Sequence, residues 1–534
     1  MKVRINDLKI PYDSEEKNLP FFAAKALGIK EKDIGKIDII KKSLDARRKN
    51  NIQFIYTVDA VVEIKKDVLR RKSITKPEEK EVSFLTERGS EKLLHRPVVI
   101  GAGPAGLMAA YVLAANGYRP LLLERGKKVE ERIEDAENFW SKGDLSSESN
   151  IGFGEGGAGT FSDGKLRTRI KNPRVSKVLQ ILIESGAPKE IAYHARPHIG
   201  TDQLCDVLIK LRDCLLSLGG DIRFESKVTN LSVKENKIVG LIINDQEEMP
   251  VDVVITATGH SARDTYEMFS NLSLAMEAKP FAIGLRIEHP QKLVDTVQFG
   301  EAAGHPNLPP AEYQLAYQSS NKRGVYTFCM CPGGYVIGAA TEQEKLTING
   351  MSEHARDGEN ANSALVVSVD QRDMNFQDPL CGIRFQRQLE AQAFQLGGGN
   401  YKAPVQKTAD FLAGKESSSI GEGSIKPTYR PGVTPADLAR CLPDQVAKAL
   451  KEGLWQFNRK MPIFLDSPSI LTGVETRTSS PVRLLRDNRR ESISIKGLYP
   501  AGEGAGYAGG IVSSGVDGME SAEALIKRFQ RPKY

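Results

Sequence analysis

The stretch that decides the fold is Pro97-Val98-Val99-Ile100-Gly101-Ala102-Gly103-Pro104-Ala105-Gly106, which is followed by a helical run and then by Leu121-Leu122-Leu123-Glu124. Strand, glycine turn, helix, strand and acid is the order of a dinucleotide-binding unit. Gly101 allows the tight turn, Gly103 lets the backbone approach a pyrophosphate, and Gly106 lets the helix pack closely on the strand. Glu124 ends the second strand, where its carboxylate can accept the hydroxyls of an adenosine ribose. The sequence therefore predicts an α/β protein with a Rossmann-like nucleotide site.

A second glycine-rich stretch, residues 152–166, has too many glycines to pack a core. Such a stretch predicts a loop whose backbone lies directly against a large planar or phosphorylated ligand. Ser162 and Lys165 could add polar contacts, with Lys165 as a candidate partner of a phosphate or a flavin. A flexible surface loop is the alternative, but Phe153 and Phe161 would be unusual in a merely solvated loop.

Two later stretches complete this pattern. The apolar run 251–256 ends in Ala257-Thr258-Gly259, and residues 498–500 lead into Gly502-Glu503. Each is typical of a buried strand that ends beside a nucleotide. Gly510 and Ile511 then begin a helical run, and the N-terminus of a helix stabilises negative charge on a bound ligand.

The order and spacing of these motifs resemble the glutathione-reductase-type two-domain FAD-binding fold. Residues 96–534 and the segment before them resemble a bacterial family of uncharacterised FAD-dependent (NAD-utilising) dehydrogenases, a likeness carried by residues 153–166, 475–481 and 499–510. The resemblance implies FAD as cofactor and redox chemistry, and it leaves the substrate open. The residues expected to hold FAD are Gly101, Gly103, Pro104, Ala105, Gly106, Glu124, Arg125, Gly157, Gly159, Thr160, Ser162, Lys165, Val228, Thr258, Gly259, Gly502, Glu503, Gly510 and Ile511.

No catalytic acid or base stands out in the sequence. Glu475 and Arg477 are candidates for substrate contact, with an ordinary ion-paired loop as the alternative. Cys329 and Cys331 lie two residues apart on one predicted strand, which is expected to form a hairpin with residues 335–340. Two small buried side chains are favoured there over a redox pair, because same-face neighbours on one strand close a disulfide only with strain.

The chain divides into four predicted segments. Residues 1–90 form a small α+β module, ferredoxin-like in outline, with a charged linker, because residues 52–64 alternate with the period of a β-strand. Residues 96–275 are the first part of the FAD-binding domain. Residues 276–475 form a substrate or cap domain that splits it, and residues 476–534 return to it.

Composition describes a globular protein of 534 residues with 40% hydrophobic and 27% charged residues. We expect no membrane span and a cytoplasmic location, because no run approaches the ~20 apolar residues that a bilayer requires and the N-terminus lacks a signal-peptide core. The six cysteines show neither disulfide-framework nor zinc spacing, so no metal is expected. A net charge of +6 neither demands nor excludes an anionic partner.

Three functions fit these residues. The first is a FAD-dependent dehydrogenase or reductase that moves a hydride between the flavin N5 and a small organic substrate; no second nucleotide-binding unit follows, so NAD(P)H would bind transiently. The second is a tRNA- or RNA-modifying flavoprotein that uses the basic residues 41–50, although this segment has no interleaved aromatic residue for base stacking and a solvated loop is favoured. The third is a flavin-binding protein without turnover.

Overall fold

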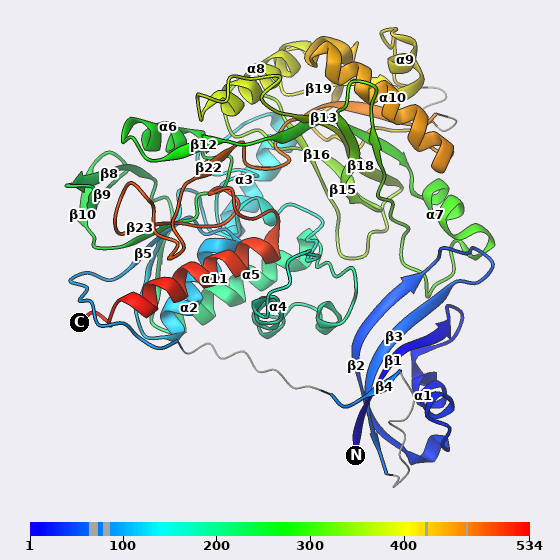
Figure 1. The fold of residues 1–534 in the computed structure, drawn as a ribbon. Coiled ribbons are helices and arrows are strands. Elements are labelled where there is room, and N and C mark those ends of the chain that lie inside the picture. Colours follow the sequence, from blue (N-terminus) through cyan, green and yellow to red (C-terminus); the bar gives the residue numbers. More distant parts are fainter. Residues whose placement is uncertain (64–72, 78–85, 422–424, 466–467, 534) are drawn as a thin grey trace.

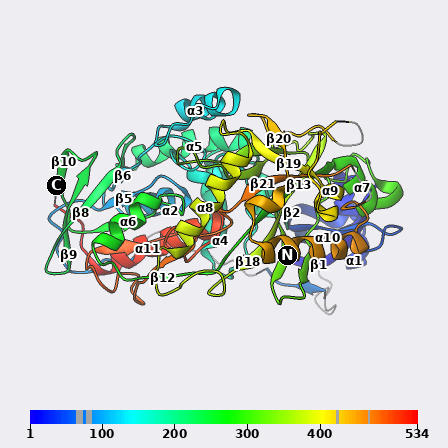
Figure 2. The same cartoon turned by 90° about the horizontal axis from the view of Figure 1, so that it is seen from above.

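The computed structural model describes residues 1–63, 73–77, 86–421, 425–465 and 468–533. Its elements form three parts: a small N-terminal sheet, a parallel sheet with its helices, and a large mixed sheet (Figure 1). Seen from above, the parallel sheet and the large sheet lie side by side, and the N-terminal strands lie beneath the large sheet (Figure 2).

The N-terminal part is an antiparallel sheet in the order β2-β3-β1-β4. Its elements are β1 (Lys2–Pro11), α1 (Leu19–Leu27), β2 (Ile34–Asp45), β3 (Gln53–Val62) and β4 (Ile74–Thr75). The alternation in β3 buries Phe54, Tyr56 and Val58 in one cluster with the apolar face of α1. The strand predicted from the alternation of residues 52–64 is β3, whereas β4 adds a strand inside the predicted linker. The ferredoxin-like arrangement stays a prediction, because residues 64–72 and 78–85 lie outside the described residues.

The stretch that decides the fold builds the centre of a five-stranded parallel sheet in the order β23-β11-β5-β6-β7. Its strands are β5 (Val98–Ile100), β6 (Leu121–Leu123), β7 (Asp221–Arg223), β11 (Val254–Thr256) and β23 (Leu498–Pro500). The accompanying helices are α2 (Pro104–Ala115), α3 (Val129–Lys142), α4 (Arg174–Glu184), α5 (Thr201–Ser217), α6 (Arg263–Asn271) and α11 (Ile511–Arg528). Helix α2 is apolar nearly all round because it packs between the sheet and α11. The predicted strand, turn, helix and strand are thus confirmed.

Smaller strand pairs flank this sheet. The antiparallel strands β8 (Val228–Lys234), β9 (Lys237–Ile243) and β10 (Glu247–Pro250) form one group. Strand β12 (Met276–Ala278) pairs with β22 (Val482–Leu484), so the chain leaves and re-enters this part at neighbouring positions.

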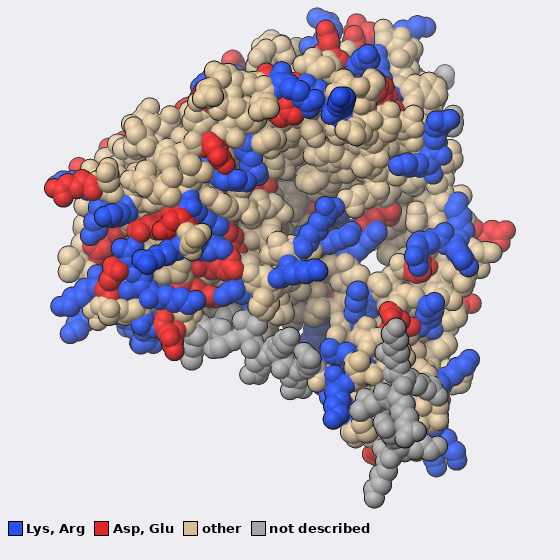
Figure 3. Space-filling view, viewed as in Figure 1, with Lys and Arg blue, Asp and Glu red and all other residues tan. Residues whose placement is uncertain are grey.

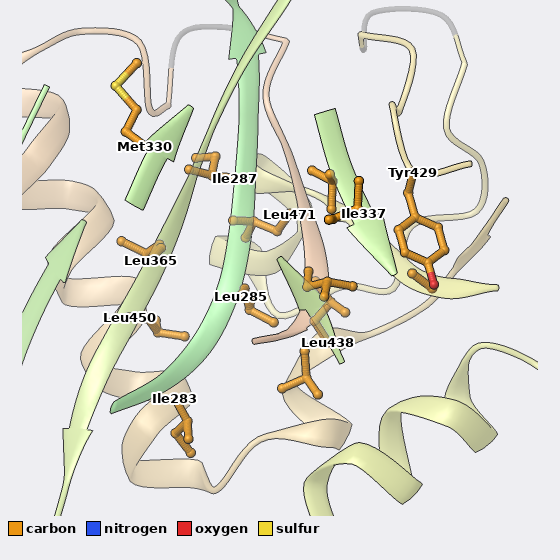
Figure 4. Close-up of a cluster of buried hydrophobic side chains, with 14 of the residues drawn as sticks. Ile283, Leu285, Ile287, Met330, Ile337, Leu365, Tyr429, Leu438, Leu450 and Leu471 are labelled. Atoms are coloured by element: carbon orange, nitrogen blue, oxygen red, sulfur yellow. The ribbon is translucent and has the colours of Figure 1, made fainter. Parts of the chain in front are cut away.

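The large sheet has the order β14-β15-β18-β13-β21-β19-β20. Its strands are β13 (Phe281–Pro290), β14 (Ala316–Gln318), β15 (Gly324–Cys331), β18 (Asn360–Val369), β19 (Ala403–Lys407), β20 (Val433–Pro435) and β21 (Ile470–Glu475). The helices of this part are α7 (Gln291–Phe299), α8 (Cys381–Leu396), α9 (Thr408–Ala413) and α10 (Asp444–Lys460). Ile283, Leu285 and Ile287 project from β13 into one cluster with Leu450 of α10 (Figure 4). Burying these side chains is the main force that holds the sheet and its helices together.

One pairing in this part differs from the sequence prediction. Strand β16 (Tyr335–Gly338) pairs with β17 (Ile348–Met351), whereas β15 pairs with β14 and β18. The predicted hairpin between residues 324–331 and 335–340 is therefore wrong. The tight turn at Pro332-Gly333-Gly334 sends the chain away from β15 into a separate two-stranded sheet.

The N-terminal part contacts both larger parts. The backbone of Lys42 in β2 exchanges two hydrogen bonds with residues 193–195: its amide donates to the Tyr193 carbonyl, and the Ala195 amide donates to its carbonyl, both at 2.8 Å. On the other side, the Asn307 amide nitrogen donates to the Tyr12 carbonyl at 3.0 Å. The small sheet is thus anchored to the parallel-sheet part and to the large-sheet part.

Candidate functional site

A cavity of about 620 Å³ lies between the parallel sheet and the large sheet. This volume is in the upper part of the range typical of ligand pockets. Figure 3 shows Lys and Arg side chains gathered around the hollow between these two parts. Two kinds of wall line the cavity, one made mostly of glycine backbone and one made of charged side chains.

The glycine wall is built by the turn after β5, the loop 152–164 and the start of α11. Gly101 has φ +100°, and a Cβ there would lie 2.5 Å from the Ala257 carbonyl oxygen, so only glycine fits the turn. Gly106 faces the protein and not the cavity, because its Cβ would lie 1.8 Å from the Gly101 oxygen. Gly103 differs from both, since a Cβ there would meet no protein atom nearer than 3.9 Å. The space over Gly103 therefore belongs to the cavity.

Glu124 closes one end of this wall. Its Oε2 accepts a hydrogen bond from the Ala102 amide at 2.7 Å, and its Oε1 accepts from Gly126 at 3.0 Å and from Gly154 at 2.9 Å. The carboxylate ties the glycine turn to the glycine loop and still lines the cavity. Each carboxylate oxygen can accept further hydrogen bonds, so a ribose fits this position.

The opposite end of the glycine wall is the N-terminus of α11. Gly510 has φ +105°, no protein atom lies within 4 Å of the Cβ position there, and its amide donates to Glu503 Oε2 at 3.3 Å. The Gly502 amide donates to buried Asp517 at 2.7 Å. His260 Nδ1 lies 3.8 Å from Glu503 Oε1, and burial lowers the pKa of His260.

The side-chain wall rests on two buried ion pairs. Arg286 donates to both oxygens of Glu475 at 2.7 and 2.9 Å, and Arg477 donates to both oxygens of Glu390 at 3.1 and 2.9 Å. Arg477 Nη1 also donates to Thr341 at 2.6 Å. Glu475 and Arg477 both line the cavity, but their charges are already paired inside the protein. Glu475 and Arg477 are thus ion-paired, as the alternative interpretation expected, and their contact with a substrate stays a prediction.

A third charged cluster joins the two walls. Asp163, in the glycine loop, accepts from Lys165 at 2.5 Å and from Arg356 at 2.8 and 2.5 Å. Burial alone would raise the pKa of Asp163, but Lys165 and Arg356 lower it to about 2. Lys165 lines the cavity, yet its ammonium is held by Asp163 and by the Met330 carbonyl. Its charge is therefore already paired inside the protein, and its contact with a phosphate or a flavin stays a prediction.

A buried carboxyl lies beneath the glycine loop. Glu155 Oε2 accepts from the Val129 amide at 2.9 Å and from Arg212 at 2.7 Å, whereas its Oε1 has no hydrogen-bond partner among the described residues. Burial raises the pKa of Glu155 to about 7.

The cavity brings together most of the residues predicted from the sequence. Those that line it are Gly101, Gly103, Pro104, Ala105, Glu124, Arg125, Gly157, Gly159, Ser162, Lys165, Val228, Thr258, Gly259, Glu475, Arg477, Gly502, Glu503, Gly510 and Ile511. Gly106 serves the helix–strand contact predicted for it. Thr160 is a correction: it is fully buried, and its hydroxyl donates to the Glu155 carbonyl and accepts from Arg132, because the short helical turn 157–159 points it into the protein.

Sequence reasoning missed much of the side-chain wall. Phe328, Cys329 and Met330 of β15 line the cavity, together with Asn349 and Arg356. The polar run from 349 to 363 is a visible signal in the sequence, but polar runs are equally common in turns. Arg167 and Arg169 also line the cavity, and they are exposed.

The glycine wall fits FAD on the evidence of its own geometry. No protein atom lies within 4 Å of a Cβ built on Gly259, Gly509 or Gly510, and the first atom near Gly103 is 3.9 Å away. Four glycines thus leave open space along one cavity, and a carboxylate suited to a ribose closes one end of it. A long dinucleotide that lies against bare backbone needs this arrangement.

The basic segment 41–50 is partly neutralised by neighbouring acids. Lys42 pairs with Glu16 at 2.7 Å, and Arg47 pairs with Asp45 at 2.6 Å. Among the described residues, no helix has both the length and the apolar character needed to cross a membrane.

Three family models match the chain. Residues 280–478 match the FAD-dependent protein, C-terminal domain-like family, residues 99–132 match an NAD(P)-binding Rossmann-like domain, and residues 2–61 match a domain of unknown function. The matched Rossmann-like segment begins within β5 and ends within α3, and the C-terminal model spans the strands of the large sheet.

Several known proteins are similar to parts of this chain in sequence or in fold. A digeranylgeranylglycerophospholipid reductase of Haloferax volcanii is 31% identical to this chain over a segment that covers 31% of this chain and 35% of the reductase. The solved structure of the halogenase PltM with FAD covers 81% of this chain and 68% of its own at 10% identity and a TM-score of 0.35. The glycine oxidase of Geobacillus kaustophilus covers 82% of this chain and 94% of its own at 10% identity and a TM-score of 0.33. TM-scores this low carry no argument about function.

A full-length relative settles the family. An uncharacterised protein of Clostridium beijerinckii is 48% identical over 100% of both chains. The chain therefore belongs to the same family as this Clostridium protein, and its two larger parts match a FAD-dependent and a nucleotide-binding family model.

Proposed function

We propose that this protein is a FAD-dependent dehydrogenase or reductase that passes a hydride between the flavin N5 and a small organic substrate, with NAD(P)H as a transient electron donor. The observation that carries the proposal is a single cavity with two unlike walls. The glycine wall offers shape for a cofactor, and the side-chain wall offers charge and hydrogen bonds for a second ligand. A protein that only stored a flavin would need the first wall alone.

In this proposal, different residues of the glycine wall bind different parts of the cofactor. Glu124, Val228 and Gly259 hold the adenosine end, and the turn at Gly103 receives the pyrophosphate. The loop around Gly157 and the start of α11 hold the ring system. The segments 96–275 and 476–534 would then form one FAD-binding domain, and residues 276–475 would form the substrate domain.

When bound, FAD supplies a centre that accepts or donates a hydride. The chain's own part is orientation and electrostatics. The N-terminus of α11, beginning at Gly510, presents the positive end of a helix dipole where negative charge would develop on a reduced ring. His260 is held neutral, because burial lowers its pKa. Glu475 is paired with Arg286, and Arg477 is paired with Glu390. Such paired groups favour positioning of the substrate over proton transfer to it.

The test is anaerobic reduction of the purified holoprotein. NADH or NADPH is added while the flavin absorbance is followed at about 450 nm, the band of any oxidised flavin. Bleaching within seconds supports a nicotinamide-driven reductase, and candidate oxidised substrates then restore the colour. If dithionite bleaches the flavin while neither nicotinamide does, the transient donor is wrong and reduced organic substrates become the donors to screen. A flavin that no donor or substrate reduces contradicts the proposal and favours a non-catalytic flavin-binding protein.

The RNA-modifying alternative has its own measurement. Binding of tRNA that weakens steeply with added salt would support it, since phosphate contacts release counterions. Substitution of Lys41, Arg48 and Lys49, the cations of the 41–50 segment without an ion-pair partner among the described residues, should then reduce the salt dependence.

A further inference from the structure

We propose that Cys329 and Cys331 form a redox-active thiol pair in the side-chain wall of the cavity, in which Cys329 attacks a small disulfide and Cys331 resolves the product. The inference goes beyond the proposed function and does not depend on hydride transfer. It rests on the local backbone of β15, on the placement of the two thiols, and on the charges around them.

The backbone of β15 is irregular at this position. Phe328 pairs with Ala364 and Cys331 pairs with Asn362, so three steps along β15 oppose two steps along β18. This is a β-bulge, and within it Cys329 has φ +43°, a left-handed conformation that non-glycine residues rarely adopt. Such outliers gather at functional sites, where surrounding structure holds them in place. The bulge also removes the regular strand geometry that argued against a disulfide between these two residues.

Two cations hold the bulge in place, the buried Arg286 and the half-buried Lys165. Arg286 Nη1 donates to the Cys329 carbonyl at 3.2 Å, and Lys165 Nζ donates to the Met330 carbonyl. Both cations come from outside β15, Arg286 from β13 and Lys165 from the glycine loop. The β-bulge is therefore held by hydrogen bonds from both walls of the cavity.

The two thiols occupy different positions. Cys329 lines the cavity, whereas Cys331 is fully buried behind it. The Cys331 thiol donates to the Cys329 carbonyl oxygen, with its Sγ 3.5 Å from that oxygen. One accessible sulfur with a second sulfur directly behind it is the layout that an attacking and a resolving thiol require.

The charges around the pair favour a thiolate at Cys329. Lys165, Arg286 and Arg356 face the pair with Asp163 and Glu475, so three cations stand against two carboxylates. The hydrogen bond from Cys331, followed by the charges of Lys165 and Arg286, lowers the pKa of Cys329 to about 6 against the opposing effects of burial and Asp163. The same hydrogen bond raises the pKa of Cys331. The surroundings therefore favour ionisation of Cys329 over ionisation of Cys331.

The chemical step balances without another reagent. The Cys329 thiolate attacks one sulfur of a low-molecular-mass disulfide, the S–S bond of that disulfide breaks, and a thiolate leaves. The leaving thiolate takes the proton of Cys331, and the Cys331 sulfur then attacks Cys329 and expels the second half as a thiolate. The products are an intramolecular disulfide, one thiol and one thiolate. Exposed Arg167 and Arg169 line the same cavity, so disulfides that carry carboxylates are the favoured class.

The first experiment is alkylation of the folded holoprotein with iodoacetamide across pH 5 to 9, with each cysteine quantified by mass spectrometry. Cys329 should react with a midpoint near pH 6, the value that its surroundings impose. Half-buried Cys205 and Cys214 are internal controls, since burial raises the pKa of both. A Cys329 midpoint at or above that of an ordinary thiol, about 8.5, overturns the proposal.

The second experiment separates attack from resolution. The reduced holoprotein is treated with bis(2-hydroxyethyl) disulfide or with the dicarboxylate dithiodiglycolate, and the products are identified by mass. The wild type should lose two hydrogens at residues 329–331, Cys331→Ser should keep a mixed disulfide on Cys329, and Cys329→Ser should not react there. A stable mixed disulfide on the wild type, or equal reaction of Cys329→Ser at Cys331, refutes the pair. Because neither readout uses flavin turnover, failure here is distinct from failure of the proposed function.

Discussion

The two walls of the cavity hold their shape in opposite ways. The glycine wall has almost no side chains, and its backbone is fixed by contacts such as that of Gly106 against the Gly101 carbonyl. The side-chain wall consists of charged groups fixed by ion pairs such as Arg286–Glu475. In the glycine wall, the space left for a side chain decides which residues are tolerated. In the side-chain wall, the balance of buried charges decides it. Substitutions in the two walls should therefore fail for different reasons.

The largest effect is expected where the glycine wall packs on itself. In Gly106→Ala, the new methyl would lie 1.8 Å from the Gly101 oxygen, and both atoms are fixed by the strand and the helix. A clash of this methyl group with a fixed backbone oxygen relaxes little, so the free energy of unfolding should fall by more than about 4 kcal/mol. Thermal unfolding by circular dichroism measures it. A variant with wild-type stability would mean that α2 can shift away from β5.

A slightly smaller loss is expected from breaking the side-chain wall. Arg286→Met leaves the Glu475 carboxylate buried without its cation, which should cost about 3–5 kcal/mol. The double variant Arg286→Met with Glu475→Leu should recover most of this loss, because an apolar pair removes the unpaired charge. Urea unfolding of the three proteins checks the prediction. If the double variant is no more stable than the single one, hydrogen bonds from Arg286 to Asn362 and Cys329 outweigh the ion pair.

Two buried carboxyl groups of the glycine loop, Glu155 and Asp163, should respond oppositely to pH. Glu155, beneath the glycine loop, has its pKa raised from 4.5 to about 7, so the folded state binds the extra proton and stability falls as pH rises from about 4.5 to 7. At 1.36 kcal/mol per pKa unit this amounts to about 3 kcal/mol, and Glu155→Gln should abolish the slope. Asp163 has its pKa lowered from 3.8 to about 2, so its contribution is lost as pH falls from about 4 to 2. Unfolding midpoints measured from pH 3 to 8 test both signs, and an unchanged slope in Glu155→Gln would contradict the first.

The smallest effect on stability, with a large effect on binding, is expected at Gly103. The Cβ of a valine there would meet no protein atom nearer than 3.9 Å, so the free energy of unfolding should stay within about 0.5 kcal/mol of the wild-type value. The same side chain would occupy the space left for FAD, and affinity should fall at least tenfold, or about 1.4 kcal/mol. The ratio of flavin absorbance to protein absorbance in the purified variant is the readout. A yellow Gly103→Val protein would show that the cofactor does not approach this glycine.

The contrast between the walls also explains what could be read from the sequence. The glycine wall was predictable from Gly101 to Glu124, because the requirement for glycine and the apolar strands are local signals. The side-chain wall was not, because its chemistry comes from partners far apart in the chain. Lys165 was predicted as a partner of a phosphate or a flavin, but its pairing with Asp163 is shared with Arg356. Residues 163 and 356 lie on different parts of the fold, so the sequence alone does not show this cluster.

Strand irregularities were equally invisible. The sequence Phe328-Cys329-Met330-Cys331 reads as a regular strand, and nothing local marks the extra residue that makes Cys329 left-handed. The pairing of β16 with β17 instead of β15 is also a choice between non-local partners that alternation alone does not decide. Local patterns located the elements, and tertiary contacts decided their neighbours.

The position of β23 and α11 has a consequence for biosynthesis. Residues 498–500 complete the parallel sheet beside β11, and residues 510 and 511 complete the glycine wall, yet β11 ends at Thr256. At ~5–20 residues per second, translation separates these pieces by roughly 10 to 50 seconds. During that interval the nascent nucleotide-binding half has an unpaired strand edge and an open cofactor cradle. The cavity wall that we propose for FAD is therefore complete only after residues 510 and 511 have been synthesised.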